Sequence, residues 1–187
     1  MALFGFGSKK KKVREMLESG QFDLLVQEAL KDKKVIKALM ELLDDSNPGV
    51  VGDALLTFTQ ILETDKNALR DYMNAESFKK LMSFVHSRNP YIRENAMLLA
   101  YGLIKEYPTI VSQYRDRIVR EIQESLAEGT KDEKGFLLVV IGELGLKELK
   151  PIVEEYVNVE DKVVLPFEGK RWVPLGQIAK ETLEKLS

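Results

Sequence analysis

Two stretches of the chain carry nearly the same pattern of apolar and polar residues. They are Lys37–Leu62, KALMELLDDSNPGVVGDALLTFTQIL, and Lys79–Ile104, KKLMSFVHSRNPYIRENAMLLAYGLI, offset by 42 residues. Seven of the 26 positions are identical, and most of the other apolar positions match in type. On both sides of an Asn-Pro turn the apolar residues recur every three or four positions, which predicts two amphipathic helices in each stretch. The chain therefore contains an internal repeat of helix pairs.

The same periodicity predicts helices along the rest of the chain. In each copy the second helix begins at Asn-Pro, because Asn caps a helix and Pro fits its first position. We expect a two-helix cap over residues 13–32, a short helical turn at Asn67–Met73, and repeats over residues 33–64, 75–106, 109–145 and 146–187. The expected repeat helices are Lys33–Asp44, Pro48–Thr64, Ala75–His86, Pro90–Glu106, Thr109–Glu128, Glu133–Gly145, Leu146–Val157 and Leu175–Leu186.

Two segments in the second half depart from the simple pattern. The helix predicted over Glu133–Gly145 is apolar on most sides, so we expect it to be the most buried, with Gly142 and Gly145 allowing close packing. Between Val159 and Pro174 the period changes to two short extended runs around Glu168-Gly169, which predicts a small hairpin-like insert. The only Trp, Trp172, lies in this insert. We expect it to pack the hairpin onto the last repeat, with a protruding contact as the alternative.

Composition limits the classes of function. The chain has 187 residues, a size typical of one domain, and its net charge of −2 gives no general attraction for nucleic acid or anionic membrane. It has no Cys, which suits a reducing compartment, and no apolar run long enough for a transmembrane helix. The apolar start precedes the lysines, unlike a signal peptide. We therefore expect a cytoplasmic protein.

The paired helices, the Asn-Pro turn followed by Val or Ile, and the Ala-rich second helix resemble HEAT/armadillo-type repeats. The segment after Glu168-Gly169, VPLGQIAKETLEKL, is similar to the phycobilisome-lyase-like HEAT branch. The resemblance implies an all-α, right-handed α-solenoid of about four repeats, with first helices on the convex side and second helices on a partner-binding concave side. It also implies that Asp45 and Arg93 form a ladder pair between neighbouring repeats.

Catalytic and metal-binding residue patterns are absent from the sequence. His86 is the only His and is expected at a solvated turn, whereas zinc and iron sites need several His or Cys ligands. We therefore predict no catalytic residues, no metal and no cofactor. A HEAT-like DNA glycosylase or a lyase-type enzyme remains an alternative, but the basic and aromatic set Arg93, Tyr101 and Lys105 is not repeated in the first copy. We expect no nucleic-acid partner.

The predicted function is a non-catalytic scaffold that binds a protein or peptide on the face formed by the second helices. The helix predicted over Pro90–Glu106 carries the most varied exposed set. The predicted partner-binding residues are Arg93, Asn95, Met97, Tyr101 and Lys105, with Val51 and Asp53 extending the face.

Residues 1–12 give an alternative function. Apolar residues are followed there by a run of lysines, which is the pattern of a weak peripheral membrane anchor. The possible membrane contacts are Leu3, Phe4, Phe6, Lys9, Lys10, Lys11 and Lys12. The alternative is a membrane-peripheral adaptor held by this segment.

Overall fold

The computed structural model describes residues 3–187, with side chains from Gly7 onward, and this part of the chain is helical apart from one small hairpin. Its α-helices are α1 (Leu3–Glu18), α2 (Phe22–Lys31), α3 (Lys33–Leu42), α4 (Pro48–Thr64), α5 (Ala75–Val85), α6 (Pro90–Glu106), α7 (Pro108–Ser112), α8 (Arg115–Glu128), α9 (Lys131–Leu144), α10 (Lys150–Glu154) and α11 (Leu175–Leu186). The shorter elements are the 3-10 helices η1 (Arg70–Tyr72) and η2 (Lys147–Leu149) and the strands β1 (Lys162–Val164) and β2 (Arg171–Pro174).

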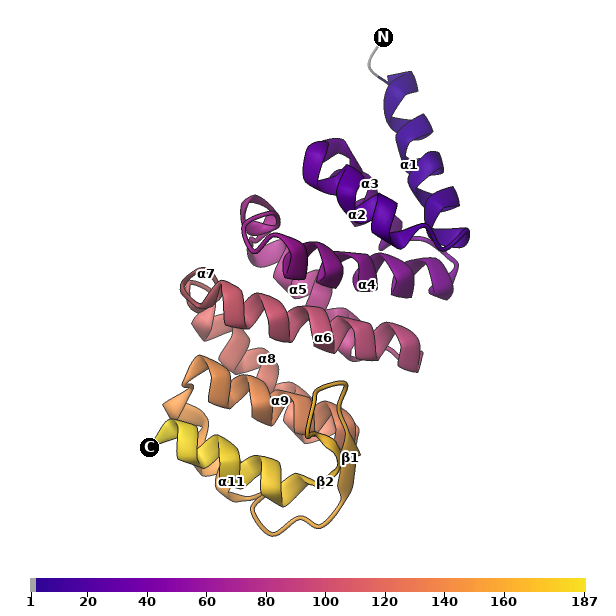
Figure 1. Ribbon diagram of the computed structural model, residues 1–187. Helices are drawn as coiled ribbons and strands as arrows, with labels where there is room; N and C mark the ends of the chain where they lie inside the picture. The colour runs from indigo at the N-terminus through magenta and orange to yellow at the C-terminus, as the bar shows by residue number, and fades with distance from the viewer. Residues whose placement is uncertain (1–2) are drawn as a thin grey trace.

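The helices are arranged in successive layers along the chain, so α1 and α11 lie at opposite ends of the stack (Figure 1). Helices α4, α6, α9 and α11 lie side by side, each packed against the next, and we call their common side the helix-B face. Helices α3 and α5 pack behind α4 and α6, and α8 packs against α9. The all-α class predicted from the sequence is confirmed.

Local sequence signals set where these helices begin. The side chain of Asn47 accepts a hydrogen bond from Gly49 N at 2.9 Å, and that of Asn89 accepts one from Tyr91 N at 2.9 Å. The repeated Asn-Pro pair therefore caps α4 and α6 as predicted. At α9, Thr130 and Glu133 form a reciprocal capping box.

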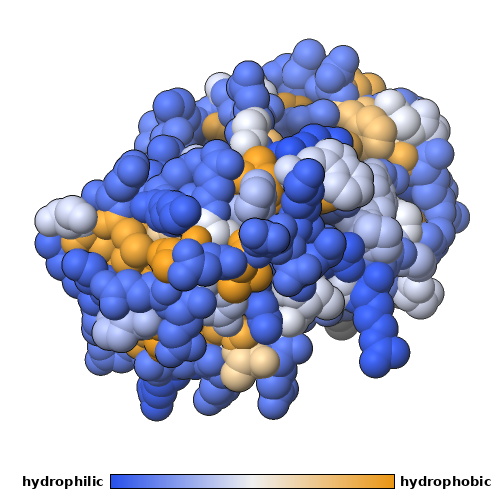
Figure 2. Space-filling view, turned by 90° about the horizontal axis from the view of Figure 1, so that it is seen from below, coloured by the Kyte–Doolittle hydropathy of each residue, from blue (hydrophilic) through white to orange (hydrophobic). Residues whose placement is uncertain are grey.

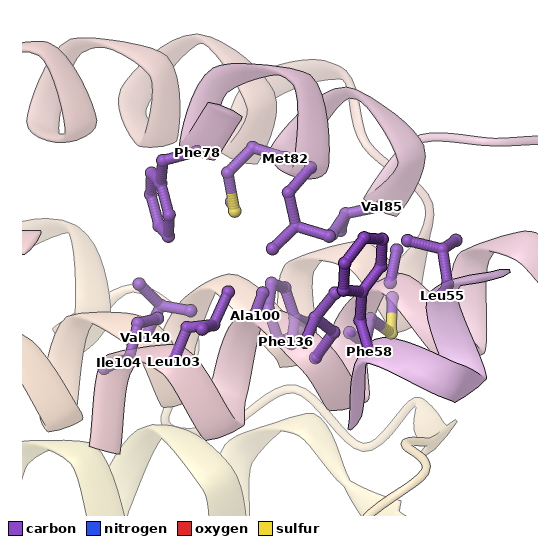
Figure 3. Close-up of a cluster of buried hydrophobic side chains, with 14 of the residues drawn as sticks. Leu55, Phe58, Phe78, Met82, Val85, Ala100, Leu103, Ile104, Phe136 and Val140 are labelled. Atoms are coloured by element: carbon purple, nitrogen blue, oxygen red, sulfur yellow. The ribbon is translucent and has the colours of Figure 1, made fainter. Parts of the chain in front are cut away.

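One apolar core runs through the layers. Ala54 on α4 and Ala96 on α6 are fully buried, and their small side chains let these two helices approach closely. Figure 3 shows side chains of α5, including Phe78 and Met82, above residues of α4, α6 and α9. Each layer thus contributes to a core shared with its neighbours, and no layer has a separate core.

Helix α9 is the most buried helix, as predicted, with nine of its 14 residues buried. A Cβ on Gly142 would lie 3.5 Å from Thr182 Cα, so this glycine does allow α11 to pack closely. The prediction for Gly145 is wrong, because nothing lies within 4 Å of a Cβ there. Gly145 has φ +60° and ends α9 in the left-handed conformation that glycine adopts most easily.

The single helix predicted over Thr109–Glu128 is instead two helices, α7 and α8, separated at Gln113–Tyr114. After the break, Arg115 donates from Nη2 to the carbonyl oxygen of Gly145 at 3.1 Å and to Glu148 Oε2 at 2.7 Å. The guanidinium therefore satisfies a carbonyl at the end of α9, a contact with no signature in the local sequence.

The last repeat also differs in detail from the prediction. The helix expected over Leu146–Val157 is reduced to η2 and α10. The predicted hairpin is confirmed, since β1 and β2 pair antiparallel with a bulge next to Val164. Figure 2 views this end of the stack from below and shows a hydrophilic surface with a band of apolar side chains. Partly buried apolar residues of this layer include Ile152, Val157 and Leu183, so the final layer leaves some apolar surface uncovered.

Candidate functional site

A pocket of about 220 Å³ opens where the loop between β1 and β2 meets the helix-B face. Its walls come from α6, α9, α11 and that loop, so four segments distant in sequence build one site. The apolar lining residues are Tyr101, Val139, Phe167 and Ile178, and the polar ones are Glu143, Glu168, Lys170, Glu181, Thr182 and Lys185. We refer to it as the hairpin pocket.

The floor of the hairpin pocket depends on the close contact between α9 and α11. Thr182 is buried on α11, and its Oγ1 donates to the carbonyl oxygen of Leu138 on α9 at 2.9 Å. Gly142, one turn further along α9, leaves room for the backbone of Thr182. These contacts fix the spacing of the two helices and hold the pocket-lining side chains in place.

An aromatic pair forms one wall. The hairpin loop reaches α6, where the ring of Phe167 lies 4.6 Å from that of Tyr101, centroid to centroid, with the planes tilted by 35°. Phe167 also lies 6.1 Å from Phe136 of α9. The loop therefore covers part of Tyr101, which leaves this predicted partner-binding residue half-buried at the pocket instead of fully open.

Ion pairs form the opposite, polar side. Glu143, whose side chain is 11% exposed, pairs with Lys105 at 3.5 Å and also with Lys185. The carboxylate of Glu143, together with Tyr101, raises the pKa of Lys105. Lys105 also lies 5.7 Å from the centre of the Tyr101 ring, within range of a cation–π contact. Of the predicted residues, Tyr101 thus lines the hairpin pocket, and Lys105 lies beside it in contact with Tyr101 and Glu143.

A second ion pair closes the pocket from the hairpin side. Lys170 of the loop pairs with Glu181 of α11, which also accepts a hydrogen bond from Gln177 at 3.2 Å. Partial burial opposes ionisation of Glu181, but the hydrogen bonds from Lys170 and Gln177 outweigh it and lower the pKa of this carboxyl. This ion pair ties the hairpin loop to α11 at the polar side of the pocket.

The prediction of partner binding is wrong for three residues, because their side chains are buried. Val51, Asn95 and Met97 are 4%, 7% and 1% exposed. The amide of Asn95 donates to the carbonyl oxygen of Tyr91 at 2.9 Å, and Met97 belongs to the core. The reason is that α4 and α6 pack against neighbours on more than one side, so less of each helix faces solvent than periodicity alone suggests.

The predicted ladder between Asp45 and Arg93 is also wrong. Asp45 accepts hydrogen bonds from Arg14 Nε at 3.0 Å and from Asn47 N at 2.8 Å, and these two bonds lower its pKa. Arg93 donates from Nη1 to the carbonyl oxygen of Ser87 at 3.1 Å, within its own turn. Asp45 thus ties the turn before α4 to α1.

Asp53, the remaining residue of the predicted face, forms a contact with Tyr91 that sequence reasoning missed. The Tyr91 hydroxyl donates to Asp53 Oδ1 at 2.5 Å, and the ring lies where a Cβ of Gly52 would be, 2.2 Å from Tyr91 Cδ1. Partial burial of the ring and the bond to Asp53 raise the pKa of Tyr91 to about 12. The absence of a side chain at Gly52 is the one sequence signal that could have indicated this contact.

His86 is exposed at the end of α5, where a surface histidine was expected. Its Nε2 lies 3.4 Å from Ser125 Oγ and its Nδ1 lies 3.8 Å from Glu133 Oε1. Glu133 Oε2 accepts the backbone N–H of Thr130 at 2.8 Å, so this carboxylate has a structural role in the cap of α9. The distance between Glu133 and His86 exceeds hydrogen-bond length, and Ser125, His86 and Glu133 lack the geometry of a catalytic triad.

In residues 3–187 no three His, Asp or Glu residues converge as metal ligands.

Trp172 is 69% exposed, so the prediction that it packs the hairpin onto the last repeat is wrong. The buried residues of the hairpin are Val163 and Leu165, both fully inaccessible. They anchor the ribbon, and the tryptophan faces solvent. This exposure agrees with the alternative interpretation, a protruding aromatic contact.

The lysines of residues 1–12 are largely engaged within the protein. Lys9 pairs with Asp32 at 3.1 Å, Lys12 with Glu28 at 3.2 Å, and Lys11 lies 4.0 Å from Glu15. Lys10 is half-buried. The side chains of the other predicted membrane contacts, Leu3, Phe4 and Phe6, lie outside the described residues. The cationic half of this segment is therefore partly neutralised by helix α2 and its flanks.

Comparison of the chain with protein-family models, with curated proteins and with solved structures finds no match in any of the three. None of the helices described for residues 3–187 combines the length and the apolar content of a membrane span.

Proposed function

We propose that this protein is a non-catalytic interaction scaffold built as a right-handed α-solenoid of about four HEAT-like repeats. The support is the internal repeat of 42 residues and the layering of α4, α6, α9 and α11 along the chain. The protein or peptide partner binds the helix-B face, with the hairpin pocket as its centre. Stacked helix pairs commonly use such an extended face for binding.

The observation that carries the proposal is the composition of the hairpin pocket. Tyr101 and Phe167 give it an aromatic wall, and half-exposed lysines surround the carboxylate of Glu143. A bound peptide can place an apolar side chain against the aromatic wall and exchange ion pairs with the lysines at the rim. Tyrosine and charged groups that meet beside a concavity are typical of interface centres.

The test compares partner capture by the wild type and by two truncations. Tyr101→Ala removes the aromatic wall, and Lys105→Ala removes one lysine and leaves Lys185 paired with Glu143. Immobilised protein is exposed to extract from the source cells, and the bound proteins are identified by mass spectrometry. We expect each truncation to weaken capture of a specific partner at least about fivefold while circular dichroism stays unchanged.

Lys37→Ala is the matched control, because Lys37 is an exposed lysine on α3, away from the pocket. It should capture the same partner as the wild type. Equal recovery by all four proteins would contradict the proposal.

A further inference from the structure

Trp172 is the only tryptophan of the chain, and at 69% it is the most exposed of the large apolar side chains in the described residues. It lies at the start of β2, on the ribbon that crosses the end of α9 (Figure 1). A folded protein gains stability by burying tryptophan, so an indole this exposed contributes little to the hydrophobic stability of the fold.

The backbone at Trp172 is also strained. Val163 pairs with Val173 and Val164 pairs with Arg171, so Trp172 is the extra residue of a bulge. Its φ is +58°, and it is the only described non-glycine residue with positive φ. Glycine would fill this position with less strain, because it has no Cβ. Strained residues that the fold retains are typical of functional sites, and bulges re-aim side chains.

The side chains around Trp172 give the site its charge. Val163 faces inward, within 3.2 Å of the position that a Cβ of Gly135 on α9 would occupy, so the opposite side of the ribbon faces solvent. Lys162 and Arg171 are both exposed, on the two strands beside the bulge. Within the described residues neither has an ion-pair partner, whereas their neighbour Lys170 is paired with Glu181.

We propose that the exposed side of this hairpin, centred on Trp172 and flanked by Lys162 and Arg171, docks an acidic segment of a partner protein that carries a large apolar side chain. Tryptophan and arginine are the residue types most enriched in interface hot spots, and the two free cations call for carboxylates on the partner. We call this the Trp172 site. It goes beyond the function proposed above, because Trp172 is not among the residues that line the hairpin pocket.

A single-stranded nucleic acid would also meet an aromatic ring and cations, since bases stack on aromatic side chains. The observations favour an acidic peptide, because only two free cations flank the ring, which is enough for one or two carboxylates and too few for a run of phosphates. The net charge of −2 also opposes a long polyanion. Nucleic-acid binding is therefore an outcome that would overturn the proposal.

The first test is a selection from a phage-displayed library of random dodecapeptides against the full chain. Trp172 is the sole tryptophan, so its fluorescence reports the binding of synthetic copies of the selected peptides that contain no tryptophan. We expect peptides with Asp or Glu close to Phe or Leu, a shift of the emission to shorter wavelength, and weaker binding at high salt.

Affinities of the variants are measured with fluorescently labelled peptide. Trp172→Gly should weaken binding about 30-fold or more, and Arg171→Glu should weaken it about tenfold. Lys105→Ala changes a residue beside the hairpin pocket whose contacts are Glu143 and Tyr101, outside the hairpin, and it should leave binding intact. Failure of either proposal can therefore be told from failure of the other. No selected peptide, peptides without acidic residues, insensitivity to Trp172→Gly, or preferential binding of an oligothymidylate would each overturn the proposal.

The second test uses stability. Relief of the left-handed strain should raise the melting temperature of Trp172→Gly by about 2 °C or more, even as binding is lost. A stabilised variant that no longer binds identifies a residue kept for interaction. A lower melting temperature for Trp172→Gly would mean that the tryptophan supports the fold, and it would overturn the proposal.

Discussion

At the scale of single residues, the contact between α4 and α6 shows how a glycine on one helix leaves room for an aromatic ring from the next helix. Gly52 has no Cβ, and the ring of Tyr91 occupies the space that a Cβ would need. This position allows the Tyr91 hydroxyl to reach Asp53. The same bond, together with partial burial, keeps the phenol protonated to a pH well above its ordinary range.

Tyr91 therefore gives a prediction about alkaline pH. Its pKa is raised from 10.0 to about 12 in the folded state, so its contribution to stability is complete below pH 10 and is lost as the pH rises through 12. We expect the free energy of unfolding of the wild type to exceed that of Tyr91→Phe by a constant amount up to about pH 10. The difference should then shrink. Urea denaturation at a series of pH values measures it.

Gly52→Ala is the companion variant, because its methyl group displaces the Tyr91 ring without removing the phenol. It should show the same loss of alkaline-sensitive stability as Tyr91→Phe. Parallel curves for the wild type and Tyr91→Phe from pH 8 to about 12 would contradict the assignment.

At the scale of elements, the hairpin forms two candidate sites. On one side its loop places Phe167 against Tyr101, and on the other the bulge exposes Trp172. The N–H of Val164 in β1 donates to Asp132 Oδ1 in the first turn of α9 at 2.8 Å. Together with the buried side chains of Val163 and Leu165, this hydrogen bond holds the strand on the most buried helix and helps to position both sites.

Removal of that acceptor should loosen the hairpin. Asp132→Ala leaves the N–H of Val164 without its partner, at a cost of about 1 kcal/mol, and should raise the open population about fivefold. We expect trypsin to cleave faster after Lys162 and Arg171, as measured by mass spectrometry over time. Asp132→Asn is the matched control, because its amide oxygen can still accept the bond. Equal cleavage rates for the alanine variant and the wild type would show that the hairpin is held by other contacts.

At the scale of the whole molecule, the stack gives its layers unequal support. Helices α6 and α9 have packed neighbours on both sides, whereas α11 ends the stack, with apolar residues such as Leu183 only partly buried. In layered helical proteins stability is close to a sum over neighbouring interfaces. The central helices should therefore open less often than those at the ends.

Hydrogen–deuterium exchange followed by mass spectrometry tests this gradient. We expect the slowest exchange in peptides from α6 and α9, at rates set by global unfolding, and faster exchange toward α1 and α11. The comparison of α9 with α11 is the most direct, because the two helices pack on each other and α9 has a further helix of the same row, α6, on its other side, whereas α11 ends that row. Uniform protection from α1 to α11 would mean that the stack unfolds as one cooperative unit.

Much of the helix placement followed from the sequence, because it depends on contacts within a few residues. Asn47-Pro48 and Asn89-Pro90 cap and start α4 and α6 where predicted, since a cap needs only the next turn of backbone. The break before Arg115 was missed, and the bond that Arg115 makes after it goes to a carbonyl group at the end of another helix, which no local pattern indicates. Of the predicted binding residues, Tyr101 lines the pocket and Lys105 contacts Tyr101 beside it, but Asn95 and Met97 are buried.

The sequence by itself determined the internal repeat, the all-α class, the caps and the presence of a hairpin, because periodicity and turn chemistry are local. Only the tertiary structure decided which charges meet. It pairs Asp45 with Arg14 instead of Arg93, and it surrounds Glu143 with two lysines from different helices. It also decided that Trp172 faces solvent, since the outward side of a bulge depends on where the ribbon packs. Such pairings depend on how the helices are placed relative to one another, and no short segment of sequence specifies that placement.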